Sequence, residues 1–303
     1  MSIVHIGVKR PRLNHNVSDR VFNGINYVLM LVISFLMLYP FVYTLSMSIS
    51  SPIYAVQNEI VLLPKGFSTE SYKLVFADEE VWQSYYNTLW YTCVGTLINV
   101  TLTIISAYPL SKKRFFLRNK LMVFVAITMF FSGGLIPSFI LISQLGLYNT
   151  RWAIVLPGAI SAWNLILART FFESIPDSLE EAAILDGANQ MKILIRVYIP
   201  LSMPIIAVLI LFYAVGHWNS YFSALLYLPN KELQPVQLYL RKVLTMANNE
   251  IIGNQMAIGY ERSLATMQLK YTVVIVTILP IICVYPFLQR YFVKGIMIGA
   301  IKG

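Results

Sequence analysis

Six long stretches of this 303-residue chain contain no aspartate, glutamate, lysine or arginine. The stretches cover residues 22–50, 81–111, 121–150, 152–168, 197–230 and 271–289. Because a helix needs about 20 apolar residues to cross the hydrocarbon core of a bilayer, most of the stretches are long enough to span a membrane. Only helices and closed barrels satisfy their backbone in lipid, and these stretches lack the alternating pattern of barrel strands. The sequence therefore predicts an all-α, polytopic membrane protein with about six transmembrane helices.

The composition agrees with this prediction, since the chain is 57% hydrophobic and 12% charged, whereas soluble domains carry about 25% charged residues. We place the spans at residues 22–50, 82–110, 121–147, 152–172, 205–227 and 271–292. Gly133-Gly134 interrupts the third span and Pro157 lies in the fourth, so breaks or kinks are expected there. The two cysteines, Cys93 and Cys283, lie in apolar stretches without metal-ligand spacing, which predicts buried, small hydrophobic side chains.

The placement of the 23 lysine and arginine residues predicts the orientation of the chain. If alternate connections share a side of the membrane, the larger share of these residues lies on one side, including a cluster over residues 112–120. The positive-inside rule places that side and both termini in the cytoplasm. The basic excess therefore reflects topology, and no nucleic-acid partner is expected.

This topology divides the chain into three parts. A cytoplasmic arm covers residues 1–20, a transmembrane domain covers residues 21–293 and a cytoplasmic tail covers residues 294–303. External loops are expected at about residues 51–80 and 228–270, and the second loop is long enough to have a function of its own. Within that second loop, residues 234–247 are predicted to form an amphipathic helix.

Residues 174–200 form a polar, small-residue-rich connection between two apolar stretches, on the predicted cytoplasmic side. Ser178 followed three residues later by Glu181 predicts a capping box at the start of a helix. Gly187 lies where the helix should stop, because glycine adopts the left-handed conformation without steric cost. The apolar positions at helical spacing are Leu179, Ala182 and Ala183. We predict a short helix, a sharp turn and a second helix. One face carries small side chains, so another protein can approach its backbone closely.

This stretch resembles the EAA loop of permease subunits from binding-protein-dependent ABC importers. The family pattern is EAA, three residues, glycine, nine residues, then I-x-L-P; here Val197 and Ile199 replace the commoner isoleucine and leucine. The surrounding sequence, roughly residues 19–303, is similar to the oligosaccharide-importer branch. It resembles the smaller maltose-importer permease and, more closely, permeases of the rhamnogalacturonan or oligogalacturonide type. The segments that carry this similarity are 87–89, 145–147, 149–150, 174–176, 186–188, 218–219 and 293–295.

The resemblance implies a permease subunit that forms half of the translocation path for an oligosaccharide and couples it to a separate ATPase. The implied partners are a second homologous permease chain, a cytoplasmic ATPase dimer and an extracellular solute-binding protein, in the lipid bilayer of a bacterial cell (inner or plasma) membrane. The expected ATPase-coupling residues are Glu180, Glu181, Ala182, Ala183, Asp186, Gly187 and Pro200, with Glu181 as the electrostatic anchor. In maltose-type permeases the C-terminal tail enters the ATPase dimer, and the corresponding residues here are Lys294, Gly295, Met297 and Gly299.

The outer half of the fifth predicted span carries polar and aromatic residues in succession. Such groups are costly at that depth unless they face protein or water. Aromatic faces stack on sugar rings and amides bond hydroxyl groups, so we predict that this segment lines the path. Its candidate residues are His217, Trp218, Asn219 and Tyr221. His217 alone is more typical of a satisfied core residue than of a proton relay, because the apolar stretches hold no carboxylate to pair with it.

No nucleotide-binding G-x-x-x-x-G-K-[ST] pattern, catalytic triad, carboxylate pair or metal cluster stands out in the sequence. We therefore expect a chain that is not an enzyme and carries no cofactor, with ATP and Mg²⁺ bound by the partner ATPase. Two alternatives remain open at this point. The first is a permease of the same architecture for a non-sugar solute, such as an amino acid or phosphate. The second is a secondary transporter, although such carriers usually keep intramembrane ionisable residues and internal repeats.

Overall fold

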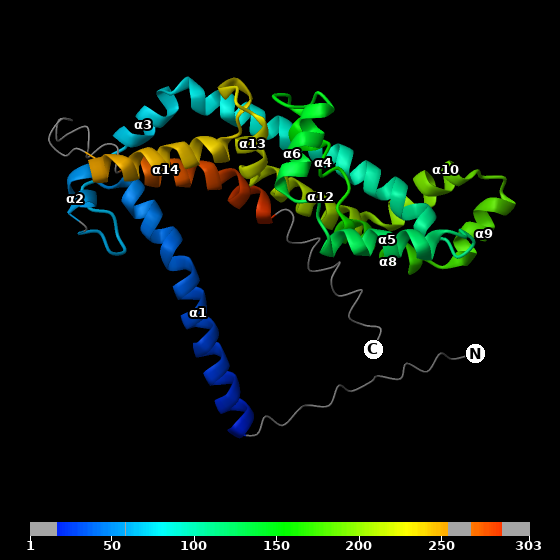
Figure 1. The fold of residues 1–303 in the computed structure, drawn as a ribbon. Helices are drawn as coiled ribbons and strands as arrows, with labels where there is room; N and C mark the ends of the chain where they lie inside the picture. The colour runs from blue at the N-terminus through cyan, green and yellow to red at the C-terminus, as the bar shows by residue number, and fades with distance from the viewer. Residues whose placement is uncertain (1–16, 58, 254–267, 287–303) are drawn as a thin grey trace.

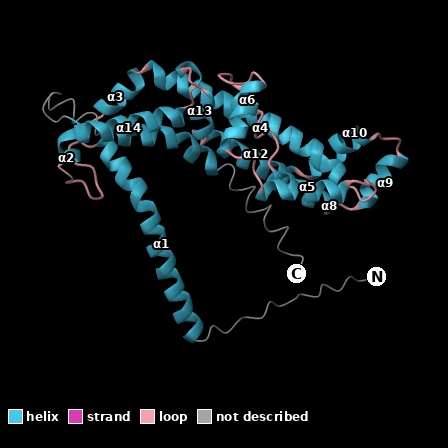
Figure 2. Cartoon of the chain, viewed as in Figure 1, coloured by secondary structure: helices cyan, strands magenta, loops and turns pink. Residues whose placement is uncertain are grey.

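The computed structural model describes residues 17–57, 59–253 and 268–286 of the chain. Within these residues the secondary structure is helical, apart from an isolated bridge between Ser50 and Phe67 (Figure 2). The predicted all-α class is thus confirmed. Most of the predicted N-terminal arm and all of the predicted C-terminal tail, including Lys294, Gly295, Met297 and Gly299, lie outside the described residues.

Helix α4 (Glu79–Ser111) runs through the body of the molecule, and the other helices are arranged around it (Figure 1). Its N-cap is Asp78, whose Oδ1 accepts a hydrogen bond from the Glu80 N–H at 2.9 Å. It packs against α12 (Met203–Trp218), α8 (Ala162–Glu173), α5 (Arg118–Phe130) and α14 (Val236–Gly253). Small and polar residues such as Gly95 and Thr103 are buried on α4. Their small side chains let the neighbouring helices approach α4 closely.

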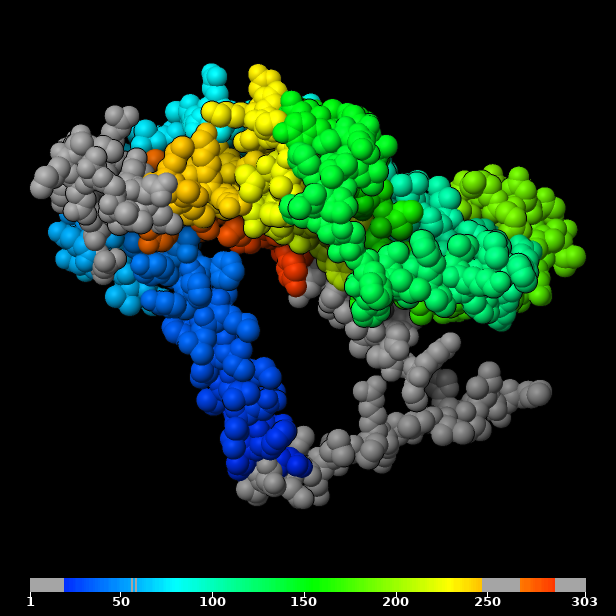
Figure 3. Space-filling model, in the orientation of Figure 1, coloured from blue at the N-terminus to red at the C-terminus, as the bar shows by residue number. Residues whose placement is uncertain are grey.

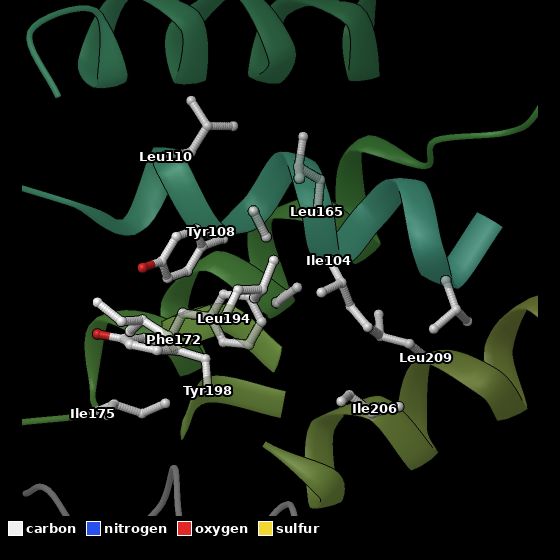
Figure 4. Close-up of a cluster of buried hydrophobic side chains, with 14 of the residues drawn as sticks. Ile104, Tyr108, Leu110, Leu165, Phe172, Ile175, Leu194, Tyr198, Ile206 and Leu209 are labelled. Atoms are coloured by element: carbon white, nitrogen blue, oxygen red, sulfur yellow. The ribbon is translucent and has the colours of Figure 1, made fainter. Parts of the chain in front are cut away.

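A buried apolar cluster joins α4, α8 and α12 to the second half of the 174–200 connection, which contributes Leu194 and Tyr198 (Figure 4). Ala107, Ala168 and Leu209 are fully buried where the three helices meet. Tyr108, Phe172 and Tyr198 are buried at one end of this cluster, and all three are labelled in Figure 4. The cluster therefore connects the predicted coupling region to the longest helix of the body.

Two of the predicted spans are broken next to glycine or proline, and the chain bends sharply just before the predicted fifth span. Helices α5 and α6 (Leu135–Gln144) meet at 115°, and Gly134 between them has a φ of 85°. The expected break at Gly133-Gly134 is thus confirmed. The segment Gln190–Leu201 meets α12 at 83°, with Pro204 in the first turn of α12. Proline lacks the N–H that would continue the preceding helix, which explains the bend.

The interruption expected at Pro157 in the fourth predicted span, 152–172, is confirmed. The span consists of α7 (Trp152–Val155) and α8, with a non-helical connection around Pro157 and Gly158. At 1.5 Å per residue the 12-residue α8 is about 18 Å long, which is shorter than the roughly 30 Å hydrocarbon core. The predicted fifth span likewise ends as α12 at Trp218 and resumes as α13 (Phe222–Tyr227).

Three helices in the described residues are long and apolar enough to cross a membrane: Asp19–Ile49, Glu79–Ser111 and Gln268–Pro286. The number rises to five if each of the two bent pairs is one span. The described part of the chain thus contains several candidate membrane helices, in agreement with the predicted polytopic class, although the 152–172 segment does not qualify by its length. The predicted burial of Cys93 and Cys283 is wrong, since both side chains are exposed on apolar helices.

Helix α1 (Val17–Ile49) extends away from the body (Figures 1 and 3), and its side chains are exposed from Asp19 to Phe41. Among the described residues, the last turns of α1 are anchored to the body, where Ser46 Oγ donates to the Leu62 carbonyl at 2.6 Å and Ser48 Oγ lies 2.8 Å from the Tyr72 hydroxyl. A helix that is apolar on all sides has to be covered by lipid or by protein.

The elements of the two predicted external loops lie together at one end of the body. They are α2 (Pro52–Val56), α3 (Glu70–Ala77), the 3₁₀ turn η2 (Lys231–Leu233) and α14. The predicted amphipathic helix over 234–247 is confirmed as α14, which extends further to Gly253. Helices α9 (Asp177–Leu185) and α10 (Gln190–Ile193) of the 174–200 connection lie at the opposite end of the body (Figure 1).

Candidate functional site

The candidate site is the 174–200 connection, whose first helix is α9. The predicted capping box is wrong, because the helix begins at Asp177 with Pro176 as its N-cap, and Ser178 lies inside the first turn without a capping hydrogen bond. Asp177 and Glu180 place negative charge in the first turn of α9, where it interacts favourably with the positive end of the helix dipole.

The end of α9 has the structure that the sequence predicts. Gly187 has a φ of 74°, in the left-handed region. Its N–H donates to the Ile184 carbonyl at 2.9 Å, and the Ala188 N–H donates to the Ala183 carbonyl at 2.9 Å. These two hydrogen bonds form a Schellman motif. A Cβ at Gly187 would have no atom within 4 Å, so the backbone conformation, and not the available space, requires glycine.

The second half of the connection is a helical segment with three parts. Asn189 is the N-cap of α10 and accepts a hydrogen bond from the Lys192 N–H at 2.9 Å. A π-helical turn, η1 (Leu194–Tyr198), follows, and then α11 (Ile199–Leu201), which contains Pro200. The predicted order of helix, turn and helix is confirmed.

Most of the predicted coupling residues are exposed. The exposed ones are Glu181, Ala182, Asp186, Gly187 and Pro200, whereas Ala183 is half-buried against the apolar cluster. Leu185 is 88% exposed at the last turn of α9. Among the ion pairs of the described residues, none involves Glu181. The exposed part of α9 thus offers a free carboxylate next to small and apolar side chains.

Glu180 differs from the rest of the predicted set because it points into the protein. It is 7% exposed, and its two carboxylate oxygens bind Lys112 Nζ and, at 2.7 Å, the Arg114 guanidinium. The Tyr198 hydroxyl donates to Glu180 Oε2 at 3.4 Å. Lys112 Nζ also lies 4.4 Å from the ring centroid of Tyr108 and 3.7 Å from that of Tyr198. Glu180 is therefore an internal contact and not part of the exposed surface.

Sequence reasoning missed the role of Lys112. It treated the basic cluster at 112–120 as a determinant of topology, yet the Lys112 side chain is buried. Burial lowers the pKa of Lys112, and the hydrogen bond and charge of Glu180 partly oppose that shift. A signal was available in the adjacent Glu180-Glu181 pair, because neighbouring helical residues point about 100° apart and can therefore have different environments.

The predicted path residues do not share one face. His217 and Trp218 pack inside the helical body: the His217 ring lies over Gly95 and 3.2 Å from Asn99 Nδ2, and Trp218 Nε1 donates to the Thr277 carbonyl at 3.3 Å. Asn219 and Tyr221 are exposed between α12 and α13. Asn219 accepts a hydrogen bond from Gln237 of α14, and Arg241 of α14 lies 5.3 Å from the Tyr221 ring centroid.

Residues 99–298 match the family described as "Binding-protein-dependent transport system inner membrane component", which is more than half of the chain. The chain belongs to this family. The permease is 35% identical to the "Polygalacturonan/rhamnogalacturonan transport system permease protein YtcP" of Bacillus subtilis, over 95% of this chain and 100% of the relative. It is 38% identical to the protein LplC of the same organism, over 95% of this chain and 98% of the relative.

The fold is also similar to that of a solved structure. A chain in the crystal structure of a bacterial ABC transporter involved in the import of the acidic polysaccharide alginate has a TM-score of 0.83 and 37% identity to the permease. The match covers 91% of this chain and 98% of that chain. The chain is accordingly a permease subunit of an ABC-type importer, and this class is favoured over a secondary transporter.

Proposed function

We propose that the permease forms half of the translocation path for an oligosaccharide, and that the oligosaccharide is a fragment of an acidic polysaccharide. The names of the relative YtcP and of the alginate importer, both similar to this chain over nearly its whole length, support this substrate class.

The exposed surface of α9 carries the proposal for energy coupling. Glu181 is exposed and forms no ion pair in the described residues. Ala182 and Gly187 are small, so no bulky side chain at these positions prevents close approach. A basic group in a cleft of an ATPase can therefore reach Glu181 while the helix seats closely against the ATPase. When the ATPase dimer closes, α9 turns as a lever and the attached helices switch access to the path.

The proposal includes the partners that such a mechanism requires. They are a second permease chain, an ATPase dimer that binds ATP and Mg²⁺, and an external solute-binding protein. The basic residues place α9 and both termini in the cytoplasm, and the tail residues 294–299 are proposed to contact the ATPase. Deletion of residues 297–303 should then reduce ATPase coupling, and unchanged transport in that variant would exclude the role of the tail.

The decisive experiment is copurification of the tagged chain followed by transport in proteoliposomes. We expect a second permease and an ATPase to copurify, and uptake to require ATP and the binding protein. Labelled oligogalacturonides should be taken up in preference to neutral maltooligosaccharides and amino acids. ATP-independent transport by the purified chain alone would overturn the proposal, and preference for a non-sugar solute would overturn its substrate class.

A further inference from the structure

The two adjacent glutamates of α9 have opposite environments. Glu181 is exposed, whereas Glu180 is 7% exposed and has three side-chain partners. Since a helix turns about 100° per residue, α9 presents one carboxylate to the outside and holds the other against the body. The exposed carboxylate serves the proposed ATPase contact, so the buried one requires a different role.

The partners of Glu180 come from two other segments of the chain. Lys112 and Arg114 follow the C-terminal end of α4, and the Lys112 N–H is bonded to the carbonyl of Pro109 in the last turn of α4 at 3.1 Å. Tyr198 belongs to the π-helical turn that leads toward α12. Glu180 thus connects the middle of α9 to α4 and to the segment that leads to α12.

Aromatic rings enclose this ion pair. The Tyr108 and Tyr198 rings meet edge to face with centroids 5.0 Å apart, and both lie against Lys112 Nζ. Each side chain of the Lys112–Glu180 pair is 9% exposed. Water and salt therefore screen the pair little, and its geometry is fixed by packing.

A second ion pair between the same two segments provides a contrast. Lys113 Nζ lies 3.0 Å from Asp177 Oδ2, but the two side chains are 79% and 66% exposed. Exposed pairs of this kind contribute little, because solvent screens them and long side chains lose entropy when they are held. Glu180 consequently provides the stronger polar attachment of α9 to the end of α4, beside the apolar contact of Ala183 with the cluster.

We propose that Glu180 is a positioning residue of energy coupling, which fixes α9 to the end of α4 so that force applied at Glu181 moves the transmembrane helices. The proposal rests on the coupling role assigned to α9 under the proposed function. Glu180 does not touch the ATPase; it acts through the orientation of α9. If the attachment is lost, ATP is hydrolysed without transport.

The test compares variants in the assembled importer reconstituted into proteoliposomes. Glu180→Gln leaves a buried lysine without a counterion and is expected to lower thermal stability. The double variant Glu180→Gln/Lys112→Met removes both charges, so its unfolding temperature should return toward the wild-type value. If Glu180 positions α9, the solute transported per ATP hydrolysed should still fall on the order of tenfold in the double variant.

A spectroscopic measurement separates positioning from simple stabilisation. Spin labels at Ser178 on α9 and Asn119 on α5, both exposed, report the placement of α9 in a background with Cys93 and Cys283 replaced by serine. The label-to-label distance distribution should be narrow in the wild type and in Glu181→Gln. It should broaden in the double variant.

The outcomes distinguish the two proposals. A double variant with wild-type transport per ATP and a narrow distance distribution would overturn the role of Glu180 while leaving α9 as the ATPase contact. If Glu181→Lys also transports normally, α9 is not where the ATPase acts, and both proposals fail. Uncoupled hydrolysis in the stable double variant, together with a broadened distribution, supports the positioning role.

Discussion

At the residue scale, neighbouring side chains of the same chemistry have different functions because the helix points them in different directions. Glu180 is enclosed by Lys112, Arg114 and Tyr198, while Glu181 is exposed. The identity of the residues does not distinguish these two glutamates. Their direction does, because only the inward one exchanges water for an ion pair.

Reversal of the exposed charge should uncouple the importer without unfolding it. In Glu181→Lys we expect loss of substrate-stimulated ATP hydrolysis and of transport, because a lysine repels the basic group proposed on the ATPase. An exposed substitution changes stability by no more than about 0.5 kcal/mol, so insertion and unfolding temperature should be unchanged. The measurement is ATPase activity and uptake in proteoliposomes, with Glu59→Lys at the other end of the molecule as a control. Wild-type uptake by Glu181→Lys would contradict the mechanism.

Gly95 should be required for the packing of α4 against α12. A Cβ at this position would lie 2.5 Å from His217 Nε2, so Gly95→Ala has to displace the ring and disturb its contact with Asn99. We expect a loss of about 1–3 kcal/mol, the usual cost of overpacking.

Gly216→Ala on α12 is the matched control for this substitution. A Cβ at Gly216 would meet nothing within 4 Å, and alanine is favoured over glycine in a helix by about 0.5–1 kcal/mol. Thermal unfolding in detergent should therefore show a lower transition for Gly95→Ala and an equal or higher one for Gly216→Ala. Equal transitions for the two variants would show that the His217 ring yields without cost.

At the element scale, short helices are held to α4 at both of its ends. At one end are the contacts of α9, and at the other the Tyr239 hydroxyl of α14 donates to Asp78 Oδ2 at 2.8 Å and Lys242 Nζ lies 2.6 Å from Glu80 Oε2. Burial and the neighbouring Asp78 carboxylate raise the pKa of Tyr239, so this hydroxyl remains a donor at neutral pH. Within the predicted external loop, residues 236–253 consequently form a helix that is fixed to α4.

The attachment of α14 should be measurable by hydrogen exchange. Lys242→Met removes a half-exposed ion pair and should cost less than about 1 kcal/mol of global stability. Amide exchange in α14 should nevertheless accelerate, because the helix loses a contact with α4. Lys231→Met, at an exposed lysine of the turn η2, is the control and should leave α14 protected. Equal protection of α14 in both variants would show that its apolar contacts alone hold it.

At the scale of the whole molecule, α4 connects two ends with different predicted partners (Figure 1). One end carries α9 and the proposed ATPase surface, and the other carries α3 and α14 on the side of the proposed binding protein. Because α4, α8 and α12 share one apolar cluster, the proposed rotation of α9 would act on several helices together. The fold is therefore suited to transmitting motion along its length.

The two ends should lie on opposite sides of the membrane. Leu185 and Leu63 are 88% and 73% exposed, so cysteines placed there in a background without Cys93 and Cys283 are accessible to reagents. A membrane-impermeant maleimide added to intact cells or spheroplasts should label Leu63→Cys but not Leu185→Cys. Permeabilisation should then expose Leu185→Cys. Labelling of both sites in intact cells would contradict the predicted orientation.

The amino-acid sequence by itself determined the helical membrane class, the break at Gly133-Gly134 and the glycine stop at Gly187, because these follow from local composition and backbone preference. Only the tertiary structure decided which glutamate faces inward, that Lys112 is buried, that Cys93 and Cys283 are exposed and that Trp218 packs inside the body. The physical reason is that direction and burial depend on partners far away in the chain, such as Lys112 for Glu180 and Thr277 for Trp218. A local pattern carries no information about those partners until the helices have packed.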